Sequence, residues 1–266
     1  MDYLKLNKKA WDAKTKIHVK SSFYDVPAFK AGNNTLNDIE MKALGDVSGK
    51  SLLHLQCHFG LDSLSWARLG AKVTGVDLSS VAIKQAQDLS EQCDLHATFI
   101  CDDVINYLQK RRQFDVVFTS YGTICWLSDI KAWAQGVARQ LKPGGTFFMA
   151  EFHPVYDLLD GYSYFHQLEP DVETETVYTE NKSEEKQAIA VWSHPLGEVI
   201  SALLCAGLSI QAFEEFDYSP YDCFDNMEER QAGQFHLQHK GNDIPLVYAL
   251  KAVKECSEET VSSYQK

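Results

Sequence analysis

Long apolar stretches are missing from this sequence, although 45% of its 266 residues are hydrophobic. No run approaches the roughly 18–20 apolar residues that cross a bilayer. The first residues, MDYLKLNKKAWDAK, also lack the apolar centre of a secretion signal. We therefore expect a cytoplasmic protein with one sizeable core and no membrane partner.

Basic residues are scarce as well. Lys and Arg together number 25 against 37 Asp and Glu, which gives a formal net charge of −12. Nucleic acid binding depends on clustered Lys and Arg side chains that meet phosphates. The compact basic cluster Lys110-Arg111-Arg112 is best interpreted as a solvated loop. We therefore expect no nucleic acid partner.

The seven cysteines include no Cys-x-x-Cys pair. Cys57, Cys101, Cys125 and Cys205 lie in or beside strand-like or helical runs. The simplest interpretation is that they are reduced, buried and small apolar residues in a cytosolic protein, so we expect no disulfide.

The most informative stretch runs from Ser51 to Ser80. It predicts a short strand at Ser51–Leu55, a turn and helix start at Gly60, and a second buried strand at Val73–Val76. Asp77 closes that strand, seventeen residues after Gly60. A carboxylate there can accept both hydroxyls of a ribose while the turn presents backbone amides. This pattern indicates a cofactor that contains a nucleoside.

The residues that follow the next strands favour S-adenosyl-L-methionine over a dinucleotide. A third strand, Ala97–Ile100, is followed by Asp102 and Asp103, and an acid there can accept the amine of an adenine ring. The dinucleotide pattern G-x-G-x-x-G is absent. A fourth strand, Phe114–Thr119, precedes Ser120-Tyr121-Gly122, and LKPGG is expected to end a helix before a fifth strand that reaches Glu151.

Taken in order, GVDLS, Asp102-Asp103-Val104, FDVVFTS and LKPGG resemble the class I S-adenosylmethionine-dependent methyltransferases over Lys50 to Glu151. The stretch LQCHFGLDSLSWARLGAKVTGVDLS is similar to an uncharacterised bacterial branch that acts on small molecules. The resemblance implies a Rossmann-like α/β fold with helices on both faces of a seven-stranded sheet, in the order 3-2-1-4-5-7-6 with the last strand antiparallel. It also implies cofactor contacts from Gln56, Cys57, His58, Gly60, Asp77, Leu78, Asp102, Asp103, Val104 and Ser120.

The first loop departs from the family pattern, acid-x-Gly-Cys-Gly-x-Gly. His54 stands in place of the acid, and Gln56 and His58 stand in place of two glycines. Side chains at those two positions are either strained or need another backbone path. The missing carboxylate also removes a partner for the cofactor's methionine end. Either Gln56 and His58 replace the lost contacts, or the pocket has been lost.

The segment before the first strand is expected to be a helical lid. Residues 1–20 look helical, Ser21–Lys30 is expected to be a loop rich in aromatics, and Asn34 is a candidate cap for a helix that runs to Leu44. In the class I fold such helices often cover the cofactor. By resemblance the lid candidates are aromatic, with anchoring of the lid as the alternative role: Trp11, Phe23 and Tyr24.

The segment after the fifth strand, His153–Ser193, is expected to be an antiparallel insertion over the active-site mouth. Val172–Thr179 alternates with a period of two, which is typical of a strand with one wet face. The insertion is strongly acidic, and a solvated face is the simplest interpretation of its Glu169, Asp171, Glu173, Glu175, Glu180, Glu184 and Glu185.

The remaining segment returns to the plan of the family. Pro195–Ala206 predicts a helix, while Leu208–Phe216 and Ile244–Lys254 predict two strands joined by the long loop Asp217–Asp243. We expect one domain over residues 1–266. Its parts are the lid (1–49), the cofactor-binding core (50–153), the insertion (154–193) and the C-terminal part of the sheet (194–266).

Ligands of open α/β sheets lie beyond the carboxyl ends of the strands, and this selects the catalytic candidates. Tyr121 is a candidate to line the methyl-transfer channel. His153 is a candidate general base, with a histidine held by hydrogen bonds before Pro154 as the alternative. Tyr24 and Trp192 are substrate candidates, and ordinary packing is the alternative for Trp192.

No histidine pair builds a convincing metal site. His54 and His58 have the spacing of helical zinc ligands but fall on a strand end and a turn, and His236 and His239 lack a further ligand. We therefore expect no metal. The favoured function is methyl transfer from S-adenosyl-L-methionine to a small-molecule acceptor by direct displacement. The alternatives are a degenerate cofactor binder, an enzyme that transfers another group, and an NAD-dependent oxidoreductase.

Overall fold

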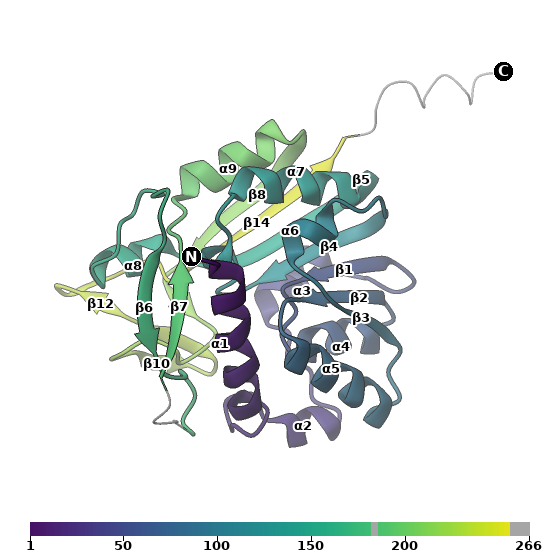
Figure 1. Ribbon diagram of the computed structural model, residues 1–266, viewed down its shortest axis with the longest axis horizontal. Helices are drawn as coiled ribbons and strands as arrows, with labels where there is room; N and C mark the ends of the chain where they lie inside the picture. Colours follow the sequence, from purple (N-terminus) through teal and green to yellow (C-terminus); the bar gives the residue numbers. More distant parts are fainter. Residues whose placement is uncertain (182–185, 256–266) are drawn as a thin grey trace.

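The computed structural model describes residues 1–181 and 186–255, and a seven-stranded sheet forms its centre (Figure 1). The strand order is β3-β2-β1-β4-β5-β14-β8, and β14 runs antiparallel to both of its neighbours. The expected order is confirmed, with β8 and β14 as the sixth and seventh strands. The strand bounds are Ser51–Leu55 (β1), Lys72–Asp77 (β2), Ala97–Cys101 (β3), Phe114–Ser120 (β4), Leu141–Phe152 (β5), Leu208–Phe216 (β8) and Val247–Lys254 (β14).

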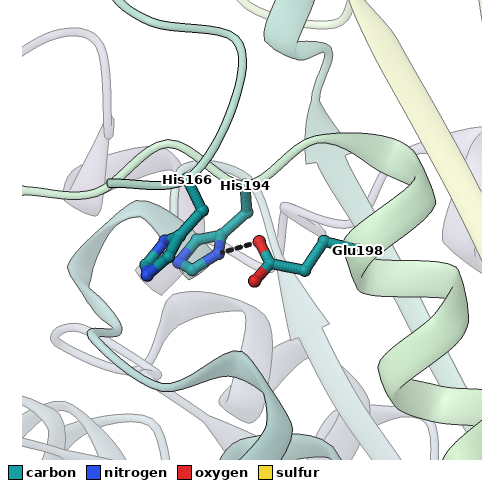
Figure 2. Close-up of side chains that lie close together, drawn as sticks. All are labelled: His166, His194 and Glu198. Atoms are coloured by element: carbon teal, nitrogen blue, oxygen red, sulfur yellow. Dashed lines mark hydrogen bonds and ion pairs between the residues drawn. The ribbon is translucent and has the colours of Figure 1, made fainter. Parts of the chain in front are cut away.

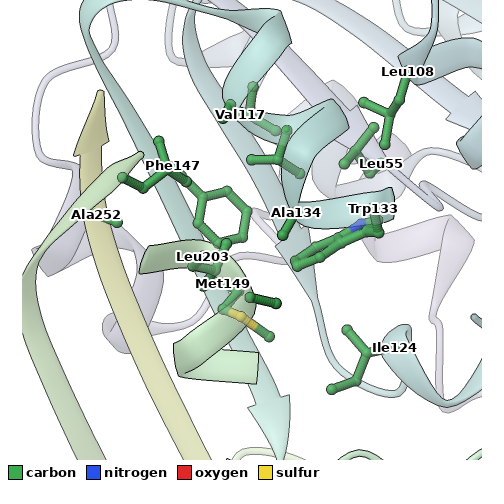
Figure 3. Packing of buried hydrophobic residues seen from close by; sticks show 14 of the residues in the cluster. Leu55, Leu108, Val117, Ile124, Trp133, Ala134, Phe147, Met149, Leu203 and Ala252 are labelled. Carbon is green, nitrogen blue, oxygen red and sulfur yellow. The ribbon is translucent and has the colours of Figure 1, made fainter. Parts of the chain in front are cut away.

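Helices cover both faces of this sheet. One face packs against α6, α7 and α9 in a core built around Trp133 and Phe147, whose ring centroids lie 5.5 Å apart in an edge-to-face contact (Figure 3). The other face packs against α3, α4 and α5. Strands buried on both faces read as continuous apolar runs, which explains the sequence of β1. The bounds of these helices are Asp38–Leu44 (α3), Leu61–Arg68 (α4), Ser80–Gln92 (α5), Val104–Leu108 (α6), Ile130–Gln140 (α7) and Leu196–Cys205 (α9).

The N-terminal segment contains one more helix than predicted. The first helix is α1, Tyr3–His18, as expected, but α2, Val26–Lys30, lies inside the predicted aromatic loop. Asp25 begins α2 because its side chain accepts the amide of Ala28.

The start predicted for the third helix was wrong. It begins after Asn37 rather than Asn34, because Asn37 and Glu40 form a capping box.

The prediction that Pro-Gly-Gly ends a helix was also wrong. The helix α7 ends at Gln140, and residues 143–145 lie within the span of β5. The pairing of β4 with β5 shifts register between Phe114 and Val116. A side chain on Gly145 would lie 3.1 Å from the carbonyl oxygen of Phe114, so the glycine allows the close approach of the two strands.

After β5 the chain forms α8 and then the expected antiparallel insertion, β6 paired with β7. The segment predicted as the loop Asp217–Asp243 instead folds into two small antiparallel sheets. Glu184 and Glu185 of the acidic run lie outside the described residues, as do residues 256–266. The bounds of these elements are Pro154–Leu159 (α8), Asp171–Glu175 (β6), Gln187–Val191 (β7), Tyr218–Ser219 (β9), Glu228–Gln231 (β10), Gln234–His236 (β11), Gln238–His239 (β12) and Asn242–Asp243 (β13).

The described cysteines are free thiols, as expected. Burial was predicted correctly for Cys57 but not for Cys101 and Cys205, which are exposed because they end the edge strand β3 and the helix α9. Among the helices of residues 1–181 and 186–255, none is long and apolar enough to cross a membrane.

Candidate functional site

The loop after β1 follows the backbone path of a glycine-rich turn despite its side chains. Gln56 and His58 have φ values of 53° and 49°, in the left-handed region, and Gly60 follows with 84°. The left-handed conformation costs about 1–2 kcal/mol for a residue with a side chain. Of the two alternatives for this loop, the structure therefore shows strain at Gln56 and His58 rather than a different path.

Two glycines allow the loop to lie close to β2 and β3. A Cβ atom on Gly60 would lie 2.8 Å from the Phe99 ring, and one on Gly75 would lie 2.8 Å from Cys57 Sγ. Any side chain at these positions would push the loop away from the sheet. The glycine of the GVDLS motif thus keeps Cys57 against the second strand.

Asp77 joins the first loop to the end of β2. Its Oδ2 accepts the backbone amide of His58 at 2.8 Å, and its Oδ1 accepts the amide of Ser79 at 2.8 Å. Burial raises the pKa of the carboxyl to about 6, although these two amides oppose that rise. A carboxylate has about four lone-pair directions, so each oxygen can still accept a hydroxyl. The site predicted for a ribose is therefore chemically able to bind one.

Gln56 presents an acceptor in the same loop. Its Nε2 donates to the carbonyl of Thr123 at 2.6 Å, while its Oε1 is buried and has no hydrogen-bond partner among the described residues. His54 cannot replace the missing acid, because its Nδ1 lies 2.8 Å from Ser63 Oγ and burial lowers the pKa of its ring to about 3. The neutral Gln56 oxygen is thus better suited than His54 to receive a cationic ammonium group.

The acids after β3 lie next to Asp77 and have partners of their own. The backbone amide of Asp102 donates to the carbonyl of Asp77 at 3.0 Å. The Asp102 side chain accepts from Asn106 and Lys110, so Lys110 of the basic cluster forms an ion pair and is not simply solvated. Asp103 caps α6 through the amide of Asn106.

The other predicted cofactor residues lie around the same strand ends. The carbonyl of Leu78 accepts the Cys101 thiol, and Val104 begins α6 with its side chain in the core. Ser120 ends β4 and hydrogen bonds to Asp62, which lies in the first turn of α4 directly after the first loop.

Aromatic side chains of the N-terminal segment cover the first loop. The Trp11 and Tyr24 rings lie 5.2 and 5.5 Å from the His58 ring. His18 Nδ1 lies 3.0 Å from His58 Nε2, and burial lowers the pKa of His18 to about 3, so this imidazole is neutral. Phe23 packs on Tyr24 at 5.1 Å and stands one layer further from the loop. The lid candidates Trp11 and Tyr24 thus contact the predicted cofactor loop directly.

The helix α1 is held in place from both sides, and Figure 1 shows it beside β7. The Asn7 side chain exchanges two hydrogen bonds with the backbone of Ala190, at 2.8 and 2.9 Å. Asp12 accepts the Ser79 hydroxyl at 2.7 Å at the start of α5. The lid therefore bridges the insertion and the predicted nucleoside corner.

Three acids of the insertion contribute to this docking, so the prediction of a merely solvated face was wrong for them. Glu175 forms an ion pair with the buried Lys14 of α1, and Glu180 accepts the backbone amide of Ser22. Glu169 accepts the Tyr3 hydroxyl at 3.0 Å. The three acids thus hold the N-terminal segment, whose contacting residues lie more than 150 positions away in the chain.

A buried acidic group behind Tyr121 was missed by the sequence analysis. The Tyr121 hydroxyl donates to Glu40 Oε2 at 3.0 Å, and Glu40 is fully buried in α3. It also accepts the backbone and side-chain amides of Asn37, which carry no charge. Burial raises the pKa of Glu40 to about 7, and it raises the pKa of the nearby Asp62 to about 6. The Asn37–Glu40 capping pattern could have located Glu40 on a helix, but its contact with Tyr121 depends on the tertiary fold.

His153 has no ring nitrogen available for catalysis in this structure. The amide of Val155 donates to its Nδ1 at 3.2 Å, so the proton is on Nε2, which donates to Glu215 at 2.8 Å. The ring caps α8 and is almost fully buried. The geometry therefore corresponds to the alternative interpretation of a histidine held by hydrogen bonds, and we do not retain it as a base.

The contacts of Glu151 and Trp192 also indicate structural roles. The Glu151 carboxylate accepts the amides of Thr123 and Ile124 at 2.8 and 3.1 Å and fixes the turn after β4. The Trp192 ring is largely buried and packs edge-to-face on Tyr3 at 5.8 Å. For Trp192 this agrees with the packing alternative.

The sheet defines a fold class. A parallel sheet in the order 3-2-1-4-5, closed by an antiparallel β14 and β8 pair, is the Rossmann-like fold of class I S-adenosylmethionine-dependent methyltransferases.

Comparison with known proteins agrees. Residues 52–145 match a family model described as a methyltransferase domain. The ubiquinone biosynthesis O-methyltransferase of Coxiella burnetii is 30% identical over 118 residues, 43% of this chain and 50% of the relative. That of Proteus mirabilis is 32% identical over 115 residues, 43% of this chain and 46% of the relative. The chain thus spans about half the length of the curated relatives it matches.

Solved structures share the fold over nearly the whole chain. A putative S-adenosylmethionine-dependent methyltransferase from Listeria monocytogenes has a TM-score of 0.57 and 18% identity, covering 86% of this chain and 100% of its own. An S-adenosylmethionine-dependent methyltransferase from Clostridium acetobutylicum has a TM-score of 0.58 and 16% identity, covering 94% and 99%. The chain therefore shares the fold of these structures, and residues 52–145 within it match the methyltransferase-domain model.

Proposed function

We propose that this protein binds S-adenosyl-L-methionine and transfers its methyl group to a small-molecule acceptor. The observation that carries the proposal is the Asp77 carboxylate, held at the end of β2 by the backbone amide of the first loop. This contact brings the predicted ribose acceptor and the predicted methionine-binding loop together at one edge of the sheet. The buried Gln56 Oε1, which has no hydrogen-bond partner within the described part of the chain, supports the fit, since it offers an acceptor where the family has a carboxylate.

The protein's own contribution is to position the reactants and exclude water. Bound S-adenosyl-L-methionine supplies a methyl group that is already activated by its sulfonium sulfur. Asp77 is suited to orient the ribose, and the rings of Trp11 and Tyr24 to cover the loop from solvent. Aromatic faces also attract a cationic centre, which suits a sulfonium ligand.

Tyr121 and Glu40 provide a path for a proton. An acceptor hydroxyl that donates to Tyr121 can lose its proton toward Glu40, because the Tyr121 hydroxyl already donates to that carboxylate. A pKa of about 7 places Glu40 in a range where it can take up a proton near neutrality.

The curated relatives are named O-methyltransferases, which makes hydroxyl compounds the first acceptors to test. The free thiols of the described residues support a cytoplasmic location.

The first test is calorimetric binding of S-adenosylmethionine and S-adenosylhomocysteine to the full chain, with NAD as the control. We expect micromolar binding of at least one sulfur ligand and none of NAD. If both sulfur ligands fail to bind, the strained loop has closed the site and the degenerate-binder alternative replaces our proposal. Binding of NAD alone would favour an oxidoreductase. A screen of hydroxyl compounds with a methyl-labelled donor then tests transfer itself.

Tyr121→Phe should lower turnover about tenfold on an acceptor found in that screen, because the hydroxyl that receives the acceptor proton is lost. Cofactor affinity should stay unchanged, since Tyr121 contacts Glu40 rather than the first loop. Turnover and binding are measured separately, with Tyr218→Phe as a matched control on β9. Equal turnover in wild type and Tyr121→Phe would remove Tyr121 from the mechanism while leaving the cofactor assignment intact.

A further inference from the structure

Away from the predicted cofactor corner, three side chains with metal-ligating atoms meet at the start of α9 (Figure 2). They are His166, His194 and Glu198, and one ligand atom of each lies within 4.8 Å of the other two. His194 directly precedes the cap of α9 and Glu198 lies in its first turn, while His166 comes from the segment between α8 and β6. The sequence analysis considered other histidine pairs and missed this one because the fold, rather than spacing in the chain, brings His166 to α9.

The hydrogen bonds of His194 require either a second proton on its ring or a metal ion beside it. Its Nε2 lies 2.8 Å from the backbone carbonyl of Leu127, which can only accept, so Nε2 carries a proton. In a neutral imidazole the other nitrogen, Nδ1, then has a lone pair. Nδ1 lies 3.0 Å from Glu198 Oε2, and a carboxylate oxygen can also only accept. Two acceptors at this distance need a proton or a metal ion between them, and the His194 side chain is fully buried.

The tautomer of His166 is fixed in the same way, by a backbone carbonyl. Its Nδ1 lies 3.2 Å from the backbone carbonyl of Ser193 and therefore donates, which leaves Nε2 with the lone pair. Its ring stacks on His194 with centroids 5.0 Å apart and an interplanar angle of 18°. Backbone carbonyls that fix the tautomer of each histidine are the usual second partners of histidines that bind metals. Both rings are thus held in the tautomer that leaves one nitrogen free to bind a metal.

We propose that His166, His194 and Glu198 bind one divalent transition metal ion of the zinc type. Two imidazoles and one carboxylate are a common protein ligand set for zinc, and the fourth position is then left to water. The ion takes the place of the proton that would otherwise join His194 and Glu198. It also joins the segment before β6 to the helix α9, and so fixes one end of the insertion to the core.

The distances are compatible with this ion. Tetrahedral zinc ligands at about 2.0–2.2 Å from the metal lie roughly 3.3 Å apart, close to the 3.0 Å between His194 and Glu198. His166 would have to approach by no more than about 1.5 Å, given the 4.8 Å limit on the cluster, and its ring would have to rotate out of the stack on His194 so that its lone pair points to the ion. Because His166 lies on an irregular segment, a small shift of this size is feasible. The Glu198 side chain is 22% exposed, which gives an ion access from solvent.

The test is zinc titration of chelator-treated full-length protein by calorimetry, without any methyl donor, so that its result is independent of the proposed function. We expect one saturable site of micromolar or tighter affinity. His166→Ala and Glu198→Gln should each weaken binding by at least about tenfold, since loss of even an outer partner of a metal ligand costs 10- to 100-fold. His239→Ala, which removes an exposed histidine on β12, should leave the affinity unchanged.

Loading the protein with Co²⁺ instead of zinc distinguishes binding at this site from binding by the free thiols. The cobalt-loaded protein should lack the strong absorption of thiolate-to-metal charge transfer, and its visible bands should disappear in His166→Ala. Melting curves of the variants without metal check that each one folds. Absence of saturable binding would mean that a proton alone joins His194 and Glu198, and it would overturn the proposal. Unchanged binding in both His166→Ala and Glu198→Gln would do the same, since the ion would then lie elsewhere.

Discussion

Asp77→Ala should weaken binding of S-adenosylmethionine by at least about 100-fold. The substitution removes the acceptor proposed for both ribose hydroxyls, and hydrogen bonds to a charged group contribute about 1.5–3 kcal/mol each. It also leaves the amides of His58 and Ser79 without their acceptor, so the strained loop loses the contact that holds it against β2. Both effects act in the same direction. Calorimetry on wild type and variant measures the loss.

Two further variants make the result specific. Asp77→Asn keeps the size of the side chain and one carbonyl oxygen, so it should bind the ligand more weakly than wild type but more tightly than Asp77→Ala. Asp88→Ala removes a carboxylate of α5 that pairs with Lys84 at the surface, and it should bind like wild type. Melting temperatures identify any variant that does not fold. Wild-type affinity in a folded Asp77→Ala protein would refute the ribose assignment.

Elements that repeat a local pattern could be predicted from the sequence. The apolar strand before Gly60, the acid at Asp77 and the order of the later motifs specify a sheet whose topology the structure confirms. These features are local, or they follow from the resemblance. The predicted bounds of β8, Leu208–Phe216, agree with the structure because Gly207, with a φ of 84°, ends the preceding helix directly before the strand.

Contacts between distant segments could not be predicted. Lys14 and Glu175 pair across 161 positions, so the acidic run looked solvated until the fold placed α1 beside it. Glu40 belongs to a capping box that is visible in the sequence, but only the tertiary fold brings the Tyr121 hydroxyl to it. His153 was a candidate base because the sequence does not show that both of its ring nitrogens are occupied. Their partners are the backbone amide of Val155 and the carboxylate of Glu215 on β8.

The buried Glu40 should make the protein less stable as the pH rises. Its pKa is about 7 in the folded state against an ordinary value of 4.5, because burial disfavours the charged form. Below about pH 4.5 the carboxyl is protonated in both the folded and the unfolded chain. As the pH rises toward 7, the unfolded chain loses the proton first, and the contribution of Glu40 to the free energy of unfolding falls by about 3 kcal/mol. Denaturant unfolding of wild type and a Glu40 variant at a series of pH values measures this contribution.

Glu40→Gln should remove that part of the pH dependence. Glutamine is uncharged, its oxygen can still accept the amide of Asn37, and its amide nitrogen can donate to the Tyr121 oxygen. The variant should therefore be more stable than wild type at pH 8, by about 2–3 kcal/mol, and similar to it at pH 4.5. Asp62 and Asp77, whose pKa values are also raised, are present in both proteins, so the difference between the two curves isolates Glu40. Glu214→Gln, at an exposed position of β8, controls for the loss of one negative charge from a protein of net charge −12. Parallel curves for wild type and Glu40→Gln across this range would mean that Glu40 is ionised at its ordinary pKa, and it would then be too weak a base for the proton path through Tyr121.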